Sequence, residues 1–361
     1  MTATPVMAVL GLAVVLLCLL MYVVLDGYDL GVGIGVLLER DPGHRRRMLE
    51  TVAVGWDGNE TWLILFAVTL WSAFPLAFGT LLPHTYLPVV VMLLALVVRG
   101  VSVEMASQGA RSRHWTTAFA VGSLLAAFSQ GFALGTLTSS LHRAGDVFSG
   151  PSFGAFGFFP VLTGLTVTAM YTALGYAYTK QKTVGRLREV AARRGRAATA
   201  VMGGLLLMVL LSISATATPL NLAGPQRAFT FGVLLLFAVA GLVASLVTFG
   251  WRQRSGAADN VPIAGLSVAV VGVLLALLAA RYPVIVPPDL TIYDTLSPSS
   301  TMNFFLIAIA LLNMPLVLAY NVFAHRAFRG KLEPEQPADH PPSSNGHVAP
   351  TDGHVVTGAG S

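Results

Sequence analysis

Residues 56–62 read Trp56-Asp57-Gly58-Asn59-Glu60-Thr61-Trp62, and the apolar run of residues 63–70 follows directly. The stretch places two carboxylates, an amide and two indoles at the mouth of a segment that suits a hydrocarbon environment. Carboxylates inside a bilayer are costly unless they are partnered, and they are functional candidates by default. We therefore take Asp57, Asn59 and Glu60 as candidate site residues, with Trp56 and Trp62 as their support.

The composition around this stretch is that of a membrane protein. The chain has 361 residues, of which 55% are hydrophobic and 11% charged, whereas about 25% are charged in soluble domains. The apolar start, residues 6–25, follows no basic segment and has no small-residue cleavage site, so we interpret it as a retained first helix. A single cysteine, Cys18, excludes an internal disulfide framework and a cysteine-based metal or iron–sulfur site.

The hydrophobic pattern predicts an all-α polytopic membrane protein with about nine transmembrane helices. A helix needs roughly 20 apolar residues to cross a bilayer, and nine segments qualify: 7–37, 58–80, 84–106, 116–139, 157–179, 198–218, 228–250, 262–281 and 301–324. We expect two four-helix bundles plus one helix. Residues 1–330 then form the transmembrane domain, and the polar tail 331–361 is predicted to be a disordered cytoplasmic segment.

Loop charges predict the orientation. With the N-terminus outside, the inside loops and the C-terminal flank hold eighteen of the 22 Lys and Arg residues, and the outside loops hold three. Cytoplasmic loops are enriched in Lys and Arg, so this bias predicts an outside N-terminus and a cytoplasmic C-terminus. The net charge of +5 does not indicate nucleic acid as a partner, because the arginines lie in the loops between apolar segments, where positive charge sets the membrane orientation.

Acidic residues are concentrated in the first three predicted spans, within residues 20–106. Five lie inside or at the edge of these spans, and the other twelve lie in loops or the tail. Burying an ion costs several kcal/mol, so scaffolding alone explains the clustering poorly; the alternative is that single members sit in water at the interface. The five are Asp26, Asp29, Asp57, Glu60 and Glu104.

In the first span, Asp26 and Asp29 are three residues apart and share one helix face. Gly27, Gly31 and Gly35 repeat every four residues, a spacing that permits close helix contact. No strand precedes these glycines and no Lys-Ser/Thr follows them, so a nucleotide-binding loop is rejected.

The second span allows two starting points. Asp57 and Glu60 have capping-box spacing, so Asp57 can simply cap the helix. Alternatively Asp41 caps a helix with Pro42 at its first position, the helix runs through Trp56, and Asp57 is an interior residue. The common role of tryptophan at this depth, for Trp56 and for Trp62, is an interfacial anchor.

In the third span, Arg99 follows an apolar run and is expected to seek a carboxylate. Asp57, Asp29 and Glu104 are the candidates, and the sequence does not choose among them. Snorkelling of Arg99 to the interface is the alternative.

The chain offers little to bind a haem or a metal ion. A haem is usually held by His, Met or Cys, and none of the eight histidines is at mid-span. The mid-span methionines are better explained by packing. No clustered His/Asp/Glu metal site, nucleophile elbow or phosphate loop is present in the sequence, so we predict no residue with a direct chemical role in catalysis and no metal site.

The motifs resemble those of subunit II of cytochrome bd-type quinol oxidases. The resemblance is carried by residues 25–33 (LDGYDLGVG), 56–64 (WDGNETWLI), Phe74-Pro75, and Arg99-Gly100 with Glu104, all in the first 105 residues. The predicted nine-span layout and the orientation fit that family along the rest of the chain. One departure is that Met105-Ala106-Ser107 stand where an aromatic and a basic residue are expected, which puts a local ion pair there in doubt.

The resemblance implies a terminal oxidase of the bacterial cytoplasmic (inner) membrane. The complex would oxidise quinol and reduce dioxygen to water, in a heterodimer with a larger subunit I that ligates haems b and d. Small accessory subunits join some members, and some bind a structural quinone. The chain itself would be a scaffold that also offers a cytoplasmic proton path.

Our hypothesis is that Glu104, Asp57 and Asp29 relay protons inward, and that Arg99 holds Asp57 ionised. Asp26 and Glu60 belong to the same proton path or to a subunit contact. The rivals are a proton-coupled secondary transporter and a purely structural assembly factor. A transporter often shows broken helices in both halves, whereas the polar residues here are confined to one half.

Overall fold

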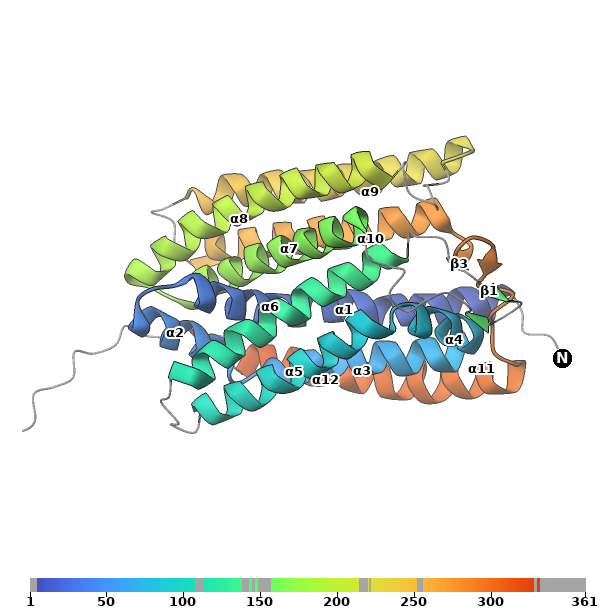
Figure 1. The fold of residues 1–361 in the computed structure, drawn as a ribbon, viewed down its shortest axis with the longest axis horizontal. Coiled ribbons are helices and arrows are strands. Elements are labelled where there is room, and N and C mark those ends of the chain that lie inside the picture. Colours follow the sequence, from blue (N-terminus) through green and yellow to red (C-terminus); the bar gives the residue numbers. More distant parts are fainter. Residues whose placement is uncertain are drawn as a thin grey trace, which may run out of the picture.

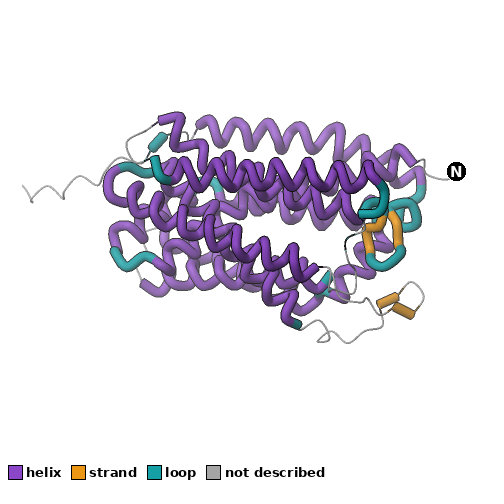
Figure 2. The backbone as a smooth tube through the Cα atoms, turned by 90° about the horizontal axis from the view of Figure 1, so that it is seen from above, coloured by secondary structure: helices purple, strands orange, loops and turns teal. Residues whose placement is uncertain are grey.

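The computed structural model describes residues 5–107, 113–137, 143–144, 147–148, 157–213, 220, 222–251, 256–327 and 330–331. The described chain is a bundle of helices that run roughly along one axis, with short strands at one end (Figures 1 and 2). This arrangement confirms the predicted all-α class.

The helices follow the chain in three groups. The first comprises α1 (Pro5–Leu38), α2 (Pro42–Val52), α3 (Trp56–Ala73), α4 (Pro75–His84), α5 (Tyr86–Ser107) and α6 (Arg113–Thr136). The second comprises α7 (Phe158–Lys182), α8 (Gly185–Ser212), α9 (Pro225–Phe249), the 3-10 turn η2 (Gly256–Asn260) and α10 (Val261–Arg281). The third is a continuous run of α11 (Ser299–Phe305), the π-helical η3 (Leu306–Asn313) and α12 (Met314–Ala327).

Strands form two short antiparallel hairpins. β1 (Arg143–Ala144) pairs with β2 (Val147–Phe148), and β3 (Val284–Val286) pairs with β4 (Leu290–Thr291). Both lie at the end of the bundle where α1 begins (Figure 1). The opposite end carries α2.

The central element of the bundle is α1. It packs against α3, α6 and α7, while α7 also packs on α8 and α9 packs on α10. In Figure 1, α7–α10 form one side of the bundle, and α3, α5 and the α11–α12 run form the other. The core beside α1 is assembled from small and aromatic side chains, among them Tyr22, Ala126 and Tyr171, all buried.

Glycines of α1 explain its close approach to α7. A Cβ at Gly31 would collide with the carbonyl oxygen of Tyr171, and one at Gly175 would collide with the backbone of Gly31. At Gly27 a Cβ would meet the Tyr171 ring at 2.7 Å, and at Gly35 it would meet the Met48 Cε of α2 at 2.6 Å. The four-residue glycine spacing therefore marks a helix contact, as predicted.

Eight helices among the described residues are long and apolar enough to cross a membrane. They correspond to the predicted spans except the second, 58–80, which is divided between α3 and α4. Phe74 ends one helix and caps the next, with φ −134° and ψ 64°, because the residue before a proline is disfavoured in the α conformation. The count of nine crossings therefore stays a prediction.

Neither predicted start of the second span is fully correct. Asp41 does cap a helix, since its carboxylate accepts the His44 N–H at 3.0 Å, but that helix is α2 and ends at Val52. The next helix, α3, has Gly55 as its N-cap, and Asp57 lies in its first turn. The interpretation of Asp57 as the cap is therefore wrong. The predicted disordered tail falls on residues of which 332–361 lie outside the described part.

Candidate functional site

The candidate site is built around a buried arginine. Arg99 of α5 has a side chain with no solvent exposure, and its Nη2 lies 2.9 Å from Asp26 Oδ1 and 3.8 Å from Asp29 Oδ2. Its Nη1 donates to Glu60 Oε2 at 3.1 Å. Three helices, α1, α3 and α5, thus meet through one cation and three carboxylates, which we call the Arg99 cluster.

Local sequence explains how each member reaches the cluster. Asp26 and Asp29 face the same way because they are three residues apart on α1, and both side chains are almost completely buried. On α6, a Cβ at Gly122 would lie 2.8 Å from the Ala95 carbonyl oxygen and 3.2 Å from the Arg99 N. The absence of that Cβ lets α6 pack closely against the arginine.

An indole also contacts the arginine. The Arg99 guanidinium carbon lies 5.7 Å from the centroid of the half-buried Trp56 ring, within the range of a cation–π contact. Gly100 makes room for the ring, because a Cβ there would meet it at 3.0 Å. The role of interfacial anchor predicted for Trp62 is wrong, because that side chain has no exposed surface and lies in the hydrophobic core.

Hydrogen bonds extend the cluster in two directions. Asn59 Nδ2 donates to Asp29 Oδ2 at 2.7 Å and to the Tyr28 hydroxyl at 2.8 Å. On the other side, Gln130 Nε2 donates to the Tyr22 hydroxyl at 2.7 Å, and the Tyr171 hydroxyl donates to Gln130 Oε1 at 2.7 Å.

The centre of the cluster is incompletely hydrogen-bonded. Among the described residues, neither oxygen of Asp26 has a hydrogen-bonded donor, and Arg99 Nε and Nη2 have no hydrogen-bonded acceptor. The 2.9 Å contact between Arg99 and Asp26 is an ion pair, and neither it nor the contact of the Tyr22 hydroxyl with Asp26 is well aligned for a hydrogen bond. Buried polar groups are normally satisfied by protein or by ordered water, so these four atoms are suited to hold water.

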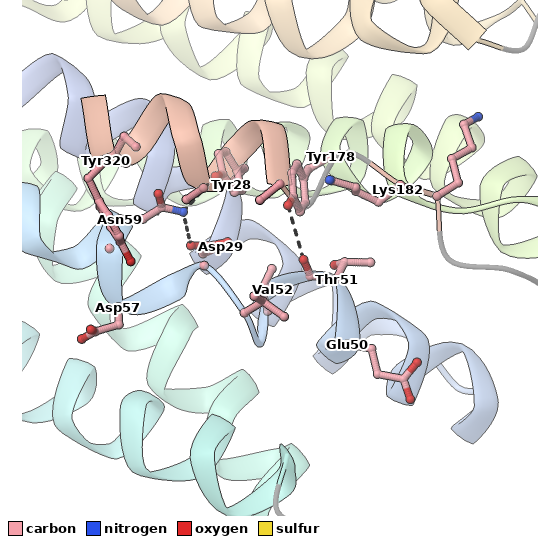
Figure 3. Close-up of a pocket in the computed structure, with 18 residues that line it drawn as sticks. Tyr28, Asp29, Glu50, Thr51, Val52, Asp57, Asn59, Tyr178, Lys182 and Tyr320 are labelled. Atoms are coloured by element: carbon pink, nitrogen blue, oxygen red, sulfur yellow. Dashed lines mark hydrogen bonds between the residues drawn. The ribbon is translucent and has the colours of Figure 1, made fainter. Parts of the chain in front are cut away.

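A pocket of ≈ 450 Å³ reaches the cluster from the α2 end of the bundle. Asp29 and Asn59 line its inner wall, the exposed Asp57 lies at its edge, and Tyr320 of α12 faces it (Figure 3). Figure 3 also shows Tyr178, whose hydroxyl donates to the Thr51 carbonyl at 3.3 Å. Asp29 is thus common to the pocket and to the Arg99 cluster.

The structure changes the expected partners of Arg99. Of the three candidate carboxylates, Asp29 is an ion-pair partner; Asp26 and Glu60 are the others among the described residues. The predicted pairing of Arg99 with Asp57 is therefore wrong. Snorkelling is wrong as well, since Arg99 is buried. Glu104 is exposed on α5 and is not among the residues that line the pocket.

A second ionic group was missed by the sequence reasoning, which placed its members in loops. The buried Asp259 of η2 accepts from Arg188 Nη2 of α8 at 2.7 Å and from Lys331 Nζ at 2.7 Å. Lys180 Nζ of α7, which is 1% exposed, lies 3.7 Å away. Gln130, Tyr22 and Tyr171 were missed too, because an uncharged polar residue within an apolar run gives no distinct signal.

His84 is buried, and its Nε2 is 2.9 Å from the Thr136 carbonyl oxygen, so that nitrogen is engaged. Within the described ranges, no three His, Cys, Asp or Glu side chains converge as metal ligands.

Comparison with known proteins decides the family. The family model described as cytochrome bd terminal oxidase subunit II matches residues 7–328. The chain belongs to this family. It is a subunit of a terminal oxidase, an oxidoreductase complex of the respiratory chain whose family architecture implies a partner subunit I.

Relatives of this subunit II cover nearly the whole chain. The chain is 26% identical over 330 residues to cytochrome bd ubiquinol oxidase subunit 2 of Bacillus subtilis, covering 87% of this chain and 93% of that one. It is 24% identical over 356 residues to cytochrome bd-I ubiquinol oxidase subunit 2 of Escherichia coli, covering 87% and 92%. A chain of the bd oxidase structure from Geobacillus thermodenitrificans shares its fold, with a TM-score of 0.68, 17% identity, and coverage of 90% and 98%.

Proposed function

We propose that this subunit is the haem-free member of a heterodimer that oxidises quinol and reduces dioxygen to water, and that it conducts protons from the cytoplasmic face. The observation that carries the proton path is the position of Asp29. Its carboxylate lines the pocket and also contacts Arg99 at 3.8 Å. A proton taken up at the pocket can therefore reach the buried cluster through a single side chain.

The haems b and d are assigned to subunit I, where they would supply electron transfer and dioxygen reduction. The residues of this chain hold and move protons. Asp57, exposed at the pocket edge, collects them, and Asn59 orients Asp29 through its 2.7 Å hydrogen bond. Arg99 offsets the negative charge of Asp26 and Asp29, whose burial would otherwise cost several kcal/mol.

The proposed orientation places the pocket at the cytoplasm. The loops at the α2 end carry most of the arginines and lysines, and cytoplasmic loops are enriched in both. The start of α1 and the end of α12 lie at opposite ends of the bundle (Figure 1), which supports an odd number of crossings. Glu104, exposed on α5 and outside the pocket, is proposed as a subunit-contact residue.

Isosteric variants in the assembled oxidase test the path. Asp29→Asn and Asp57→Asn keep the side-chain shape but cannot carry a proton as a carboxylate does, so we expect turnover per haem to fall about 10-fold or more. Asp26→Asn, in the same cluster but away from the pocket, tests whether the path continues beyond Asp29. Glu104→Gln is expected to lower complex yield and not turnover per haem.

Three measurements separate the explanations: quinol-dependent oxygen consumption, haem content from the visible spectrum, and co-purification of subunit I. Normal turnover and haem content in both pocket variants refutes the relay. Equal loss of haem in Asp26→Asn and Asp29→Asn indicates a structural cluster. A colourless chain that is stable without a larger partner would instead favour the transporter alternative.

A further inference from the structure

A second pocket, separate from the proton path, lies where the end of α1, the start of α2 and the first turns of α8 meet. Its volume is ≈ 420 Å³, within the range of about 300–1,000 Å³ typical of small-molecule sites. Seven of its eight lining residues are ionisable: Glu39, Arg40, Asp41, His44, Arg186, Arg193 and Arg194, with Val190 as the exception. None of them lines the pocket of Figure 3.

The two acids of this pocket are already engaged. Glu39 Oε2 accepts from Arg194 Nη1 at 3.0 Å, and the same oxygen lies 3.7 Å from His44 Nδ1. Asp41 accepts the backbone N–H of His44 as the cap of α2. Its pKa is lowered first by that hydrogen bond, so the carboxylate is ionised and occupied at neutral pH.

The other three arginines of the pocket are only partly neutralised, because Arg186 attracts Asp41 and lowers its pKa without a direct contact. The guanidinium groups of Arg40, Arg186 and Arg193 form no hydrogen bond or ion pair with any described residue. Arg186 and Arg193 are seven residues apart, hence on one face of α8. Counting His44 as neutral, four arginines face two carboxylates, which leaves a formal excess of two positive charges.

Helix dipoles add to this positive field. Both α2 and α8 begin beside the pocket, at Pro42 and at Gly185, and each N-terminus carries partial positive charge. The first turn of α8 contains Arg186 and no acidic residue, and its N-cap Val184 provides no side-chain hydrogen bond. A cation at this end of a helix is unfavourable on its own. An anion that binds between the arginines and the start of α8 would offset this unfavourable electrostatic energy.

We propose that this pocket binds a phosphate group, held by Arg40, Arg186 and Arg193. The guanidinium fork matches phosphate oxygens in pairs. The positive-inside rule explains why arginines lie on this side of the membrane; it does not explain why three unpaired ones converge on one pocket. The phosphate can come from an anionic phospholipid head group, which basic pockets at the cytoplasmic surface recognise, or from a soluble phosphate compound.

The experiment uses the assembled oxidase, purified through this chain and delipidated in mild detergent. In one arm, native mass spectrometry counts phosphatidylglycerol or phosphatidylcholine retained after addition of either lipid. In the other arm, pyrophosphate is titrated and the thermal unfolding midpoint is recorded. Arg186→Gln and Arg193→Gln are the test variants. Arg196→Gln is the matched control, because Arg196 is exposed on α8 but does not line the pocket.

We expect saturable binding of one probe, weakened about ten-fold or more by each test variant, since each removes a charge-assisted hydrogen bond. Arg196→Gln should bind like the unaltered protein. Retention of phosphatidylglycerol alone identifies a lipid head group, and a response to pyrophosphate alone identifies a soluble phosphate. Equal weakening by Arg196→Gln, or no saturable binding of either probe, overturns the proposal. The haem spectrum and the presence of subunit I confirm that each variant is assembled.

Discussion

Replacing Arg99 by glutamine tests the central contact of the fold and of the site together. The substitution removes the cation that faces Asp26, Asp29 and Glu60 and leaves an amide in its place. Glutamine is shorter than arginine and uncharged, so its amide cannot hydrogen-bond all three of these carboxylates. The expected result is an oxidase that assembles in lower yield and unfolds more readily.

The loss of stability expected from Arg99→Gln follows from how deeply these charged side chains are buried. The side chains of Arg99 and Asp26 are 0% exposed and that of Asp29 is 1% exposed, so bulk solvent does not compensate the loss of the cation. Glu60, at 24%, keeps some access to water and contributes less. Breaking a buried ion pair by removing one partner costs about 3–5 kcal/mol. We expect Arg99→Gln to fall in this range, and Arg196→Gln, an exposed control on α8, to stay within about 0.5 kcal/mol.

A double-mutant cycle with Asp26→Asn makes the argument quantitative. In the Arg99→Gln background, Asp26→Asn removes an unpaired buried charge and should restore part of the stability. The coupling between the two positions should be about 1–3 kcal/mol. The assay is the fraction of intact complex during a graded SDS titration in mixed micelles. A coupling energy below about 0.5 kcal/mol would show that the two charges do not depend on each other, which would refute the reasoning.

Three further predictions concern other contacts. Gly31→Ala places a methyl group against the Tyr171 carbonyl and should cost about 1–3 kcal/mol in the same titration, whereas Gly79→Ala, with nothing within 4 Å, should be neutral. Asp259→Asn leaves the buried Lys180 without its carboxylate and should cost about 3–5 kcal/mol, seen as a lower thermal unfolding midpoint. The His44 N–H lowers the pKa of Asp41, so the α2 cap is complete above pH about 4 and is lost as pH falls through that lowered pKa; hydrogen exchange at the His44 amide should show this loss, and Asp41→Asn should remove the pH dependence.

Much of the Arg99 cluster could be predicted, because its signals are local. Helical spacing placed Asp26 and Asp29 on one face, and the cost of a buried cation required carboxylate partners for Arg99. The choice between Asp57 and Glu60 could not be predicted. They are three residues apart on α3, and only the rotation of α3 against α5 decides that Glu60 faces the arginine while Asp57 is exposed at the edge of the pocket. That rotation is set by tertiary packing.

Other differences have similar causes. Phe74-Pro75 carries a signal for a helix break, but hydropathy averaged over a span conceals it, so one continuous helix was expected where α3 and α4 are separate. Asp259 lies in a short turn between two predicted spans, where an acid is normally solvated. Its burial results from the packing of η2 against α7 and the contacts with Arg188 and Lys331. No periodicity in the sequence reports such a contact.

The two buried ionic groups differ in a way that bears on function. Asp259 is fully engaged: its oxygens accept from Arg188 and from Lys331, as a carboxylate with a structural role should. Asp26 lies 2.9 Å from Arg99, yet among the described residues no well-aligned hydrogen bond reaches either of its oxygens. Incomplete satisfaction is costly in a dry interior, so stability alone would favour the arrangement seen at Asp259. The persistence of the less satisfied arrangement at Asp26, beside a pocket that shares Asp29, supports the proposed proton path. This contrast predicts that charge-removing variants at Asp259 alter stability first, whereas those at Asp29 alter turnover first.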